Sequence, residues 1–465
     1  MKVNGLNKWI NEWYEQHEEE LNEYMHDVWA HPELGLFTKH AAEASYAFAT
    51  THGFPDAIIS RAGEGVKTNT ENPNAVIAEY GSGKPVIGIV GELDALPGLG
   101  NGDVPGKAPI AGPGHGCGHN LIAGAAMGAA CALRYAMEKE GIKGTLRLVE
   151  APGEEVGRGK ALLAKDGVFS DMDLAIMWHP GPNEFSAEPQ PGLCILAGSF
   201  EFRGKSAHAA GAPWAGRSAL DAVQLMNMGC EFLREHVTKD CLLHYQITNG
   251  GGAPNIVPDY ASVKYFCRAA NNEHVKDLYE RVVKCGEGAA HMTDTEFEPK
   301  LIFIIPYFYQ NEPLYKYLHD ISMEIPDVEY TEEDYEFARK LIEDYTGAAT
   351  DKSNEELLPA SKKTYEGMQE RSTCTDAADM SYFCPTAHIH GGGSAAGSPG
   401  HHWTITACSG SPIGQKAAVR AGKVLAEGAF EAFGNQALID ECWAFQKTLN
   451  IPSYDEVYSI EIKDE

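Results

Sequence analysis

Short apolar runs of strand length alternate with helical patterns in the first part of this chain. The runs are rich in Val, Ile, Leu and Ala and cover residues 75–80, 86–91, 145–150 and 174–178. A Gly/Ala-rich helical pattern at 121–138 separates the second run from the third. Because neighbouring parallel strands need a crossover connection, usually a helix, this alternation predicts a parallel sheet covered by helices.

A long amphipathic helix is expected before the first run. Its apolar stripe is Leu6, Ile10, Trp13, His17, Leu21, Met25 and Val28, and Pro32 and Gly35 end the pattern. Near the other end, residues 331–363 are acidic with a helical pattern, which predicts a solvated surface element. Residues 416–433 predict a closing helix.

The order of the elements changes near Gly192. Strand, helix, two strands, helix and strand are expected at 195–202, 219–236, 242–248, 261–268, 273–290 and 296–304. This order is that of a ferredoxin-like unit, which forms a self-contained layer of sheet and helices. We therefore expect a discontinuous main domain over residues 1–191 and 306–465, with a second domain inserted at residues 192–305.

Composition narrows the possible partners. With 465 residues the chain is too long for one ordinary core, which agrees with two domains. The net charge of −29 repels nucleic acid and anionic membranes, so we expect neither as a partner. The apolar runs are too short to cross a bilayer, and the first residues lack the apolar core of a secretory signal. We therefore expect a cytoplasmic protein whose eleven scattered cysteines are free thiols.

The densest cluster of residues that could bind a metal or take part in catalysis is the glycine-rich segment GPGHGCGHN at 112–120. Its glycines let the backbone turn tightly, so that Cys117 and His119 can converge. A thiolate and an imidazole are good ligands for a borderline or soft divalent metal. The alternative is a glycine-rich turn with incidental polar residues, or a redox thiol, although Cys117 has no CxxC partner.

Carboxylates follow the run at 145–150. Glu150, Glu154 and Glu155 stand in the sequence EAPGEE, at a strand end, where α/β proteins build their sites. Of two adjacent carboxylates, one can bind a metal while the other takes a proton from metal-bound water. The alternative for this segment is a solvated turn or an acidic helix start.

Three further groups follow apolar runs or glycines. Asp94 follows the run 86–91 and could bind a metal or orient a ligand histidine. His179 follows the run 174–178, and the alternative is a histidine with a structural role. His401 and His402 lie in a glycine-rich segment, and the alternative is that they are exposed surface residues without a function. Together these groups supply ligands for two metals and a base, which predicts a di-metal hydrolase. A metal-binding protein without catalysis remains the alternative from another functional class.

The motifs also resemble a known family. GELDALP, GHGCGHN, APGEE, WHP, GKSAHAAGAP, PNIVPD and GHHWT occur in the order seen in the M20 metallopeptidase/amidohydrolase family, and they look most similar to its aminobenzoyl-glutamate hydrolase branch. Glu92 and Asn120 depart from the pattern, because many relatives have Asp at both positions. The resemblance implies an α/β catalytic domain, with a central mixed sheet flanked by helices, interrupted by a ferredoxin-like α+β lid or dimerisation domain.

The resemblance also implies roles for individual residues. The metal ligands would be Cys117, His119, Glu155, His179 and His401, with His402 as the alternative to the last. Glu154 would be the general base, and Asp94 would orient a ligand histidine. His208, from the lid of the partner subunit, would hold the reacting carbonyl oxygen, and Asn255 would line the substrate site.

The expected function is hydrolysis of the amide bond of an N-acyl or N-aroyl amino acid, similar to aminobenzoyl-glutamate, by a metal-activated water. A dipeptidase or aminoacylase on the same scaffold is the alternative. The cofactors would be two divalent metal ions, Mn²⁺ or Zn²⁺. The protein would be a homodimer formed through the inserted domain. Arg217 and Arg268 are candidates for binding the substrate carboxylate, with surface or structural roles as the alternative.

Overall fold

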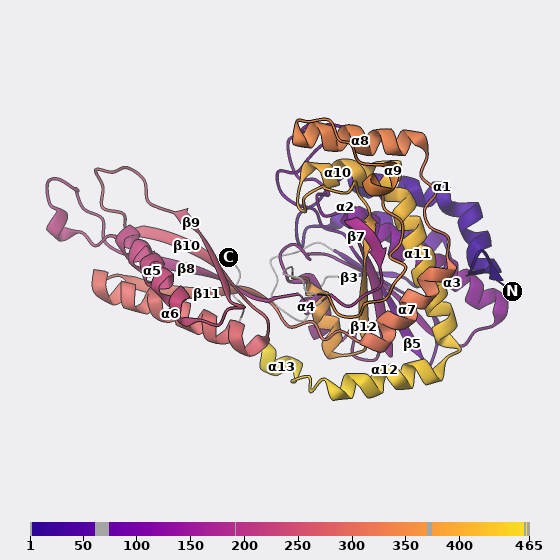
Figure 1. Cartoon of the computed structure of the whole chain (residues 1–465). Coiled ribbons are helices and arrows are strands. Elements are labelled where there is room, and N and C mark those ends of the chain that lie inside the picture. The colour runs from indigo at the N-terminus through magenta and orange to yellow at the C-terminus, as the bar shows by residue number, and fades with distance from the viewer. Residues whose placement is uncertain (1, 61–73, 191, 370–373, 460–461, 463–465) are drawn as a thin grey trace. The chain divides into compact units, whose positions relative to one another are not determined.

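The computed structural model describes residues 2–60, 74–190, 192–369, 374–459 and 462, and the chain divides into two compact units (Figure 1). The first unit comprises Met1–Gln190, Tyr309–Gln369 and Asp379–Ile451. The second comprises Pro191–Phe308 together with the described residues of Glu370–Ala378 and Pro452–Glu465. Two stretches near the C-terminus, which the sequence prediction placed in the main domain, therefore cluster with the second unit.

The first unit is built on a six-stranded sheet with the order β12-β7-β5-β6-β4-β3. Its strands are β3 (Ile58–Ser60), β4 (Ala75–Ser82), β5 (Val86–Glu92), β6 (Gly144–Ala151), β7 (Leu174–Ser186) and β12 (Thr386–Gly393). All four expected runs are strands, and β7 continues through His179 to Ser186.

The sheet is mixed, which confirms the fold implied by the family resemblance, whereas the alternating runs taken alone had predicted a parallel sheet. Strands β12, β7, β5 and β6 are parallel to one another, but β4 runs antiparallel to β6 and β3 antiparallel to β4. Only residues 83–85 join β4 to β5. A connection this short cannot hold the crossover that parallel strands require, so β4 has to reverse direction.

Three long helices of the first unit pack on one another: α1 (Lys8–Ala30), α3 (His119–Glu140) and α11 (Pro412–Phe433). Helix α3 also packs on β5 and is buried along most of its length. Its small residues allow this close packing, because a Cβ at Gly124 would lie 2.1 Å from Met25 Cγ and one at Gly128 would lie 2.6 Å from Leu21 Cδ2.

The remaining elements of the first unit are shorter. They are β1 (Lys2–Val3), β2 (Leu6–Asn7), α2 (Lys39–Thr51), α4 (Gly159–Lys165), α7 (Glu312–Glu324), α8 (Glu332–Thr346), α9 (Asn354–Leu357), α10 (Trp403–Gly410) and α12 (Gln436–Thr448). The 3-10 segment η3 (Asp376–Tyr382) begins in residues of the second unit and ends in residues of the first.

Two expectations for the C-terminal half need correction. Helix α8 is not merely a solvated element, because Ala338, Leu341 and Ile342 are buried in a cluster of their own. Residues 347–353 and 358–363 are also not helical. Helix α11 does not close the chain, because α12 follows it after a short turn.

The second unit has the expected strand and helix order. Its elements are β8 (Cys194–Arg203), η1 (Pro213–Ala215), α5 (Ala219–Leu233), η2 (Arg234–His236), β9 (Leu242–Asn249), β10 (Tyr260–Ala269), α6 (Asn272–Thr293), β11 (Glu296–Ile305) and α13 (Tyr454–Val457). The four strands form an antiparallel sheet in the order β11-β8-β10-β9, and α5 and α6 pack side by side on it (Figure 1). Phe200, Phe202 and Tyr265 are fully buried between sheet and helices.

Within the described ranges, none of the helices combines the length and the apolarity that crossing a bilayer would require.

Candidate active site

Six of the predicted site residues come together in the first unit. Asp94 follows β5, Glu154 and Glu155 follow β6, and His179 lies in β7. Because these three strands are parallel, the segments that follow them meet at one edge of the sheet. Cys117 lies just before α3, and His119 is the first residue of that helix.

The distances between the side chains are those of atoms that could share a cation. Cys117 Sγ lies 3.3 Å from His179 Nε2, and His119 Nε2 lies 3.7 Å from Glu155 Oε1. The other carboxylate oxygen of Glu155 lies 3.7 Å from Nε2 of His401, which joins the cluster from the loop before α10. Three overlapping sets each have their ligand atoms within 4.8 Å of one another: Cys117/His119/His179, Cys117/Glu155/His401 and His119/Glu154/Glu155.

Glycine at position 118 places the first two candidate ligands. Gly118 has φ +81° and stands at the start of α3, so the chain turns sharply between Cys117 and His119. A Cβ at this position would lie 2.8 Å from Pro180 Cγ, beside His179. Only glycine combines this left-handed backbone with so close an approach to β7.

Asp94 holds the loop after β6 in place. Its two carboxylate oxygens accept hydrogen bonds from the backbone N–H groups of Glu154 and Glu155, at 3.0 and 3.1 Å. Oδ1 also lies 3.3 Å from His119 Nδ1. One buried carboxylate therefore contacts a candidate ligand and the backbone of both candidate acids.

Lys160 was not predicted from the sequence. It is fully buried in α4, and its Nζ donates to Glu92 Oε1 at 2.6 Å. Burial opposes ionisation of Glu92, but Lys160 and then His119 outweigh it and lower the pKa of this carboxyl to about 2. No signal in the short pattern GKALLAK marks this lysine as buried, because lysines in short helices are usually exposed.

Strand β12 adds two more imidazoles that the sequence prediction missed. The His388 and His390 rings have centroids 5.7 and 6.2 Å from that of His179. The two histidines stand two positions apart in the strand, so both side chains point to the same face. This HxH spacing in a strand beside β7 was the available signal.

The protein atoms at this site fit a cation. Burial raises the pKa of the Cys117 thiol, and Glu155 raises it further. Burial also raises the pKa of Glu155 to about 7, although His119 opposes the shift. In the described part of the chain, Glu155 Oε1 and His119 Nε2 are buried without a hydrogen-bond partner. A divalent ion would satisfy these atoms and favour the ionised thiol and carboxyl.

The two late histidines have different surroundings. His401 has a left-handed backbone (φ +51°) and lies near Glu155, with 59% of its side chain exposed. His402 instead stands at the start of α10, where its Nδ1 accepts a hydrogen bond from Thr404 N at 3.4 Å. The geometry therefore favours His401 over His402 as the residue that joins the cluster.

His208 and Asn255 lie together in the second unit. Ala209 N donates to Asn255 O at 3.0 Å, so the two segments run side by side. The side-chain Nδ1 of His208 accepts hydrogen bonds from the backbone N–H groups of Ala210 and Gly211. An imidazole that accepts through Nδ1 carries its proton on Nε2 when neutral, so exposed His208 presents a donor.

The two candidate arginines of the second unit have protein partners. Arg217 pairs with Asp294 at 3.1 Å and donates to backbone oxygens of its own loop. Arg268 donates to Cys374 Sγ at 3.1 Å. These contacts give both arginines a structural role.

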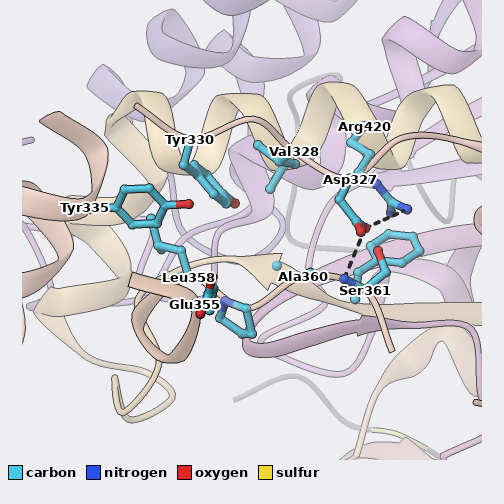
Figure 2. Close-up of a pocket in the computed structure, with 13 residues that line it drawn as sticks. Asp327, Val328, Tyr330, Tyr335, Glu355, Leu358, Ala360, Ser361 and Arg420 are labelled. Atoms are coloured by element: carbon cyan, nitrogen blue, oxygen red, sulfur yellow. Dashed lines mark hydrogen bonds and ion pairs between the residues drawn. The ribbon is translucent and has the colours of Figure 1, made fainter. Parts of the chain in front are cut away.

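A cavity of about 100 Å³ in the first unit contains none of the predicted site residues. Arg420 and Asp327 line it, and Figure 2 shows Asp327 between Arg420 and the backbone of Ser361. Arg420 also donates to the carbonyls of Ser322 and Pro326.

Comparison with known proteins identifies the family of this chain. Residues 88–406 match the model of peptidase family M20/M25/M40. The chain is 33% identical to one of the subunits of p-aminobenzoyl-glutamate hydrolase of Escherichia coli (strain K12), over 94% of this chain and 93% of that protein. This chain belongs to the M20 family. It is accordingly a hydrolase of amide or peptide bonds.

Two other similar proteins extend the comparison. The chain is 30% identical to the Xaa-Arg dipeptidase of Mus musculus, over 59% of this chain and 61% of that protein. The crystal structure of the aminobenzoyl-glutamate utilization protein of Klebsiella pneumoniae superposes with a TM-score of 0.64 at 16% identity and covers 91% of this chain and 98% of that one. At this identity the structural likeness shows the shared M20 fold alone.

Proposed function

We propose that this M20 protein is a two-metal amidohydrolase that cleaves the amide bond of N-acyl or N-aroyl amino acids related to aminobenzoyl-glutamate. The observation that carries the proposal is the convergence of one thiol, three imidazoles and a carboxylate beside a second carboxylate, Glu154. The similarity to the p-aminobenzoyl-glutamate hydrolase of Escherichia coli over nearly the whole chain supports the substrate class.

The residues that would hold the metals are Cys117, His119, Glu155, His179 and His401. The mixture of sulfur, nitrogen and oxygen donors suits Zn²⁺ and also permits Mn²⁺. When bound, the ions would polarise the amide carbonyl and lower the pKa of water at the site.

Glu154 is the general base in this proposal. Its Oε2 lies 3.9 Å from His119 Nε2, at the rim of the cluster, and 11% of its side chain is exposed. Asp94 fixes its backbone, so the carboxylate is positioned to take a proton from the attacking water and pass it to the leaving nitrogen. Each oxygen of Glu155 lies 3.7 Å from an imidazole nitrogen, of His119 on one side and of His401 on the other. The proton transfer is therefore assigned to Glu154.

His208 would complete the site from the partner subunit of a homodimer formed through the second unit. Strand β9 lies at an edge of its sheet and exposes Leu242, Tyr245 and Ile247. An exposed apolar edge strand is a template for pairing with another chain. The Nε2 proton of the partner's His208 could then stabilise negative charge on the carbonyl oxygen.

Replacement of Glu154 tests the catalytic proposal. We expect Glu154→Gln to keep the metal content of the wild type and to lose activity toward aminobenzoyl-glutamate by several orders of magnitude. Glu184→Gln, at an exposed position in β7, is the matched control and should keep both. Full activity of Glu154→Gln would remove this residue from the mechanism, and inactivity of the wild type on every amide would leave a metal-binding protein without catalysis.

A substrate panel separates the proposed activity from a dipeptidase or aminoacylase. The 30% identity to the Xaa-Arg dipeptidase gives the dipeptidase a specific basis. We expect kcat/KM to be highest for aminobenzoyl-glutamate among aroyl amino acids, acetyl amino acids and dipeptides. A higher value for a dipeptide would replace the proposed substrate class and keep the metal site.

A further inference from the structure

A second cluster of metal-ligand side chains lies between α1 and α2, away from the proposed catalytic residues. His17 and Glu20 are three residues apart on α1 and therefore share a face of the helix. His52 stands at the C-terminal end of α2. One ligand atom from each residue lies within 4.8 Å of the other two.

The separations within this cluster match the geometry of a bound ion. His17 Nδ1 lies 3.5 Å from Glu20 Oε2, and His52 Nε2 lies 3.2 Å from Glu20 Oε1. Ligands bound to zinc at about 2.0–2.2 Å in a tetrahedral arrangement are separated by roughly 3.3–3.6 Å. The two distances are close to this range and end on different oxygens of Glu20, so the carboxylate lies between the two imidazoles, and one ligand atom of each residue is within 4.8 Å of the others.

His52 supplies an independent observation. Its side chain is 6% exposed, and among the described residues its Nε2 is buried with no hydrogen-bond partner. Glu20 Oε1 lies 3.2 Å from this nitrogen, as an ion-pair partner for protonated His52, but the contact lacks the geometry of a hydrogen bond. A buried nitrogen without a partner is unfavourable unless something else occupies the position between the two side chains.

A similar set of residues on the same two helices shows the contrast. His40 Nε2 makes a 2.9 Å hydrogen bond with Asp27 Oδ2, and His31 Nδ1 makes one of 2.9 Å with the backbone oxygen of Asp27. These contacts satisfy the nitrogens that face Asp27. The Asp27 set is therefore explained by hydrogen bonding, whereas the His52 nitrogen is not.

We propose that His17, Glu20 and His52 bind a divalent transition-metal ion such as Zn²⁺, at a site that shares no residue with the catalytic cluster. Two imidazoles and one carboxylate are a known ligand set for zinc, with water able to supply a further ligand. The ion would tie the end of α2 to the middle of α1. We assign this ion a structural role, because the set of three residues holds one carboxylate, which binds the ion, and no second one that could act as a base.

Counting bound zinc in matched variants tests this site. Wild type, Glu20→Gln, Cys117→Ser and the double variant are saturated with Zn²⁺, freed of loosely bound ion and analysed for zinc per chain. We expect Glu20→Gln to hold one equivalent less than the wild type, and the double variant one less than Cys117→Ser. Equal zinc content in wild type and Glu20→Gln would overturn the proposal, whatever the catalytic cluster binds.

Two controls make the count specific. Glu19→Gln replaces an exposed neighbouring carboxylate, and it should keep every equivalent of the wild type. Loss of zinc in this variant as well would indicate general binding to acidic side chains and would also overturn the proposal. Far-ultraviolet circular dichroism checks that each variant is folded.

Fluorescence provides a second measurement. The Trp13 ring lies 5.1 Å from that of His17 and 5.7 Å from that of His52, so a paramagnetic ion such as Co²⁺ at this site should quench it. We expect saturable quenching in wild type and in Cys117→Ser. The part of the quenching that Trp13 contributes, measured as the difference from the matching Trp13→Phe variant, should disappear in Glu20→Gln, and an unchanged Trp13 contribution in Glu20→Gln would contradict the assignment.

Discussion

Adjacent residues can have different roles at this site, as His401 and His402 show. His401 Nε2 lies 3.7 Å from Glu155, whereas His402 Nδ1 accepts from the backbone at the start of α10. The left-handed backbone at His401 turns the two rings apart. The residue pattern alone did not separate the two histidines, because the deciding contact is with a loop almost 250 positions earlier in the chain, and it was the family resemblance that favoured His401.

Alanine substitutions should separate the two histidines. We expect His401→Ala to lose a metal equivalent and most of the activity. His402→Ala should keep its metal and activity while the free energy of unfolding falls by at most about 1 kcal/mol, the usual effect of losing a helix cap. Metal analysis and urea unfolding measure the two effects. Loss of metal from His402→Ala alone would reverse the assignment.

Glu150 is a buried carboxyl with no hydrogen-bond partner in the described part of the chain. Burial, and then the charge of Glu92, raise its pKa well above the ordinary value. The folded state therefore keeps this proton over a pH range in which the unfolded chain has lost it. Since the folded state binds more protons, its stability falls as the pH rises above the unfolded pKa of 4.5.

Glu150→Gln should remove this loss of stability. We expect the variant to gain free energy of unfolding over the wild type as the pH is raised from 5 to 8, by roughly 1–3 kcal/mol. Urea unfolding at the two pH values measures the difference. Glu19→Gln, at an exposed position, should show no such trend. A gain that is the same at both pH values would mean that the carboxyl ionises alike in both states.

Among the elements, α3 shows that close packing can require a glycine at a position where helix propensity alone would favour alanine. Glycine is unfavourable inside a helix, yet Gly124 and Gly128 allow α1 to approach α3 closely. The Gly/Ala-rich pattern at 121–138 predicted a helix but not which neighbour required its glycines. The same holds for the candidate site, because the sequence predicted which strands end in polar residues but not that α4 would bring Lys160 to Glu92.

Alanine at two helical glycines should act in opposite directions. Gly124→Ala should lower the free energy of unfolding by about 1–3 kcal/mol, because the new methyl group overlaps Met25. Gly288→Ala, in α6, should raise it by up to about 1 kcal/mol, because no atom lies within 4 Å of the added group. Thermal or urea unfolding measures both. A stabilised Gly124→Ala variant would show that α1 can move away without loss.

At the scale of the whole molecule, the residues proposed for the site are divided between the two units. The catalytic cluster belongs to the first unit, whereas His208 and Asn255 belong to the second. A chain that assembles through its second unit could supply the partner's His208 to each site. The homodimer is a proposal, and the feature that supports it, the position of β9 at the edge of its sheet, depends on the order of strands, which the sequence does not give.

Mixing two inactive variants tests the shared site. We expect His208→Ala and Glu154→Gln to be almost inactive separately. After exchange of subunits, each mixed dimer has one site with both residues, so about a quarter of the wild-type activity should return. Two copies of the same variant, treated in the same way, are the control. No recovery despite proven subunit exchange would place His208 in the site of its own chain or outside catalysis.

The sequence by itself determined most of the elements and the identity of the candidate ligands. Periodicity predicted α1, α3 and the second unit, because the spacing of apolar residues along the chain reflects which face of an element is buried. Polar residues after apolar runs predicted one edge of the sheet, because parallel strands end together.

Only the tertiary structure decided what those residues contact. The reversal of β4, the Lys160–Glu92 pair, the imidazoles of β12 and the cluster of His17, Glu20 and His52 all join segments that are distant in sequence. Burial and electrostatic neighbours, which set pKa values and leave nitrogens such as that of His52 without partners, arise only when those segments pack. The pattern of neighbouring residues along the chain does not indicate which distant segments will pack together.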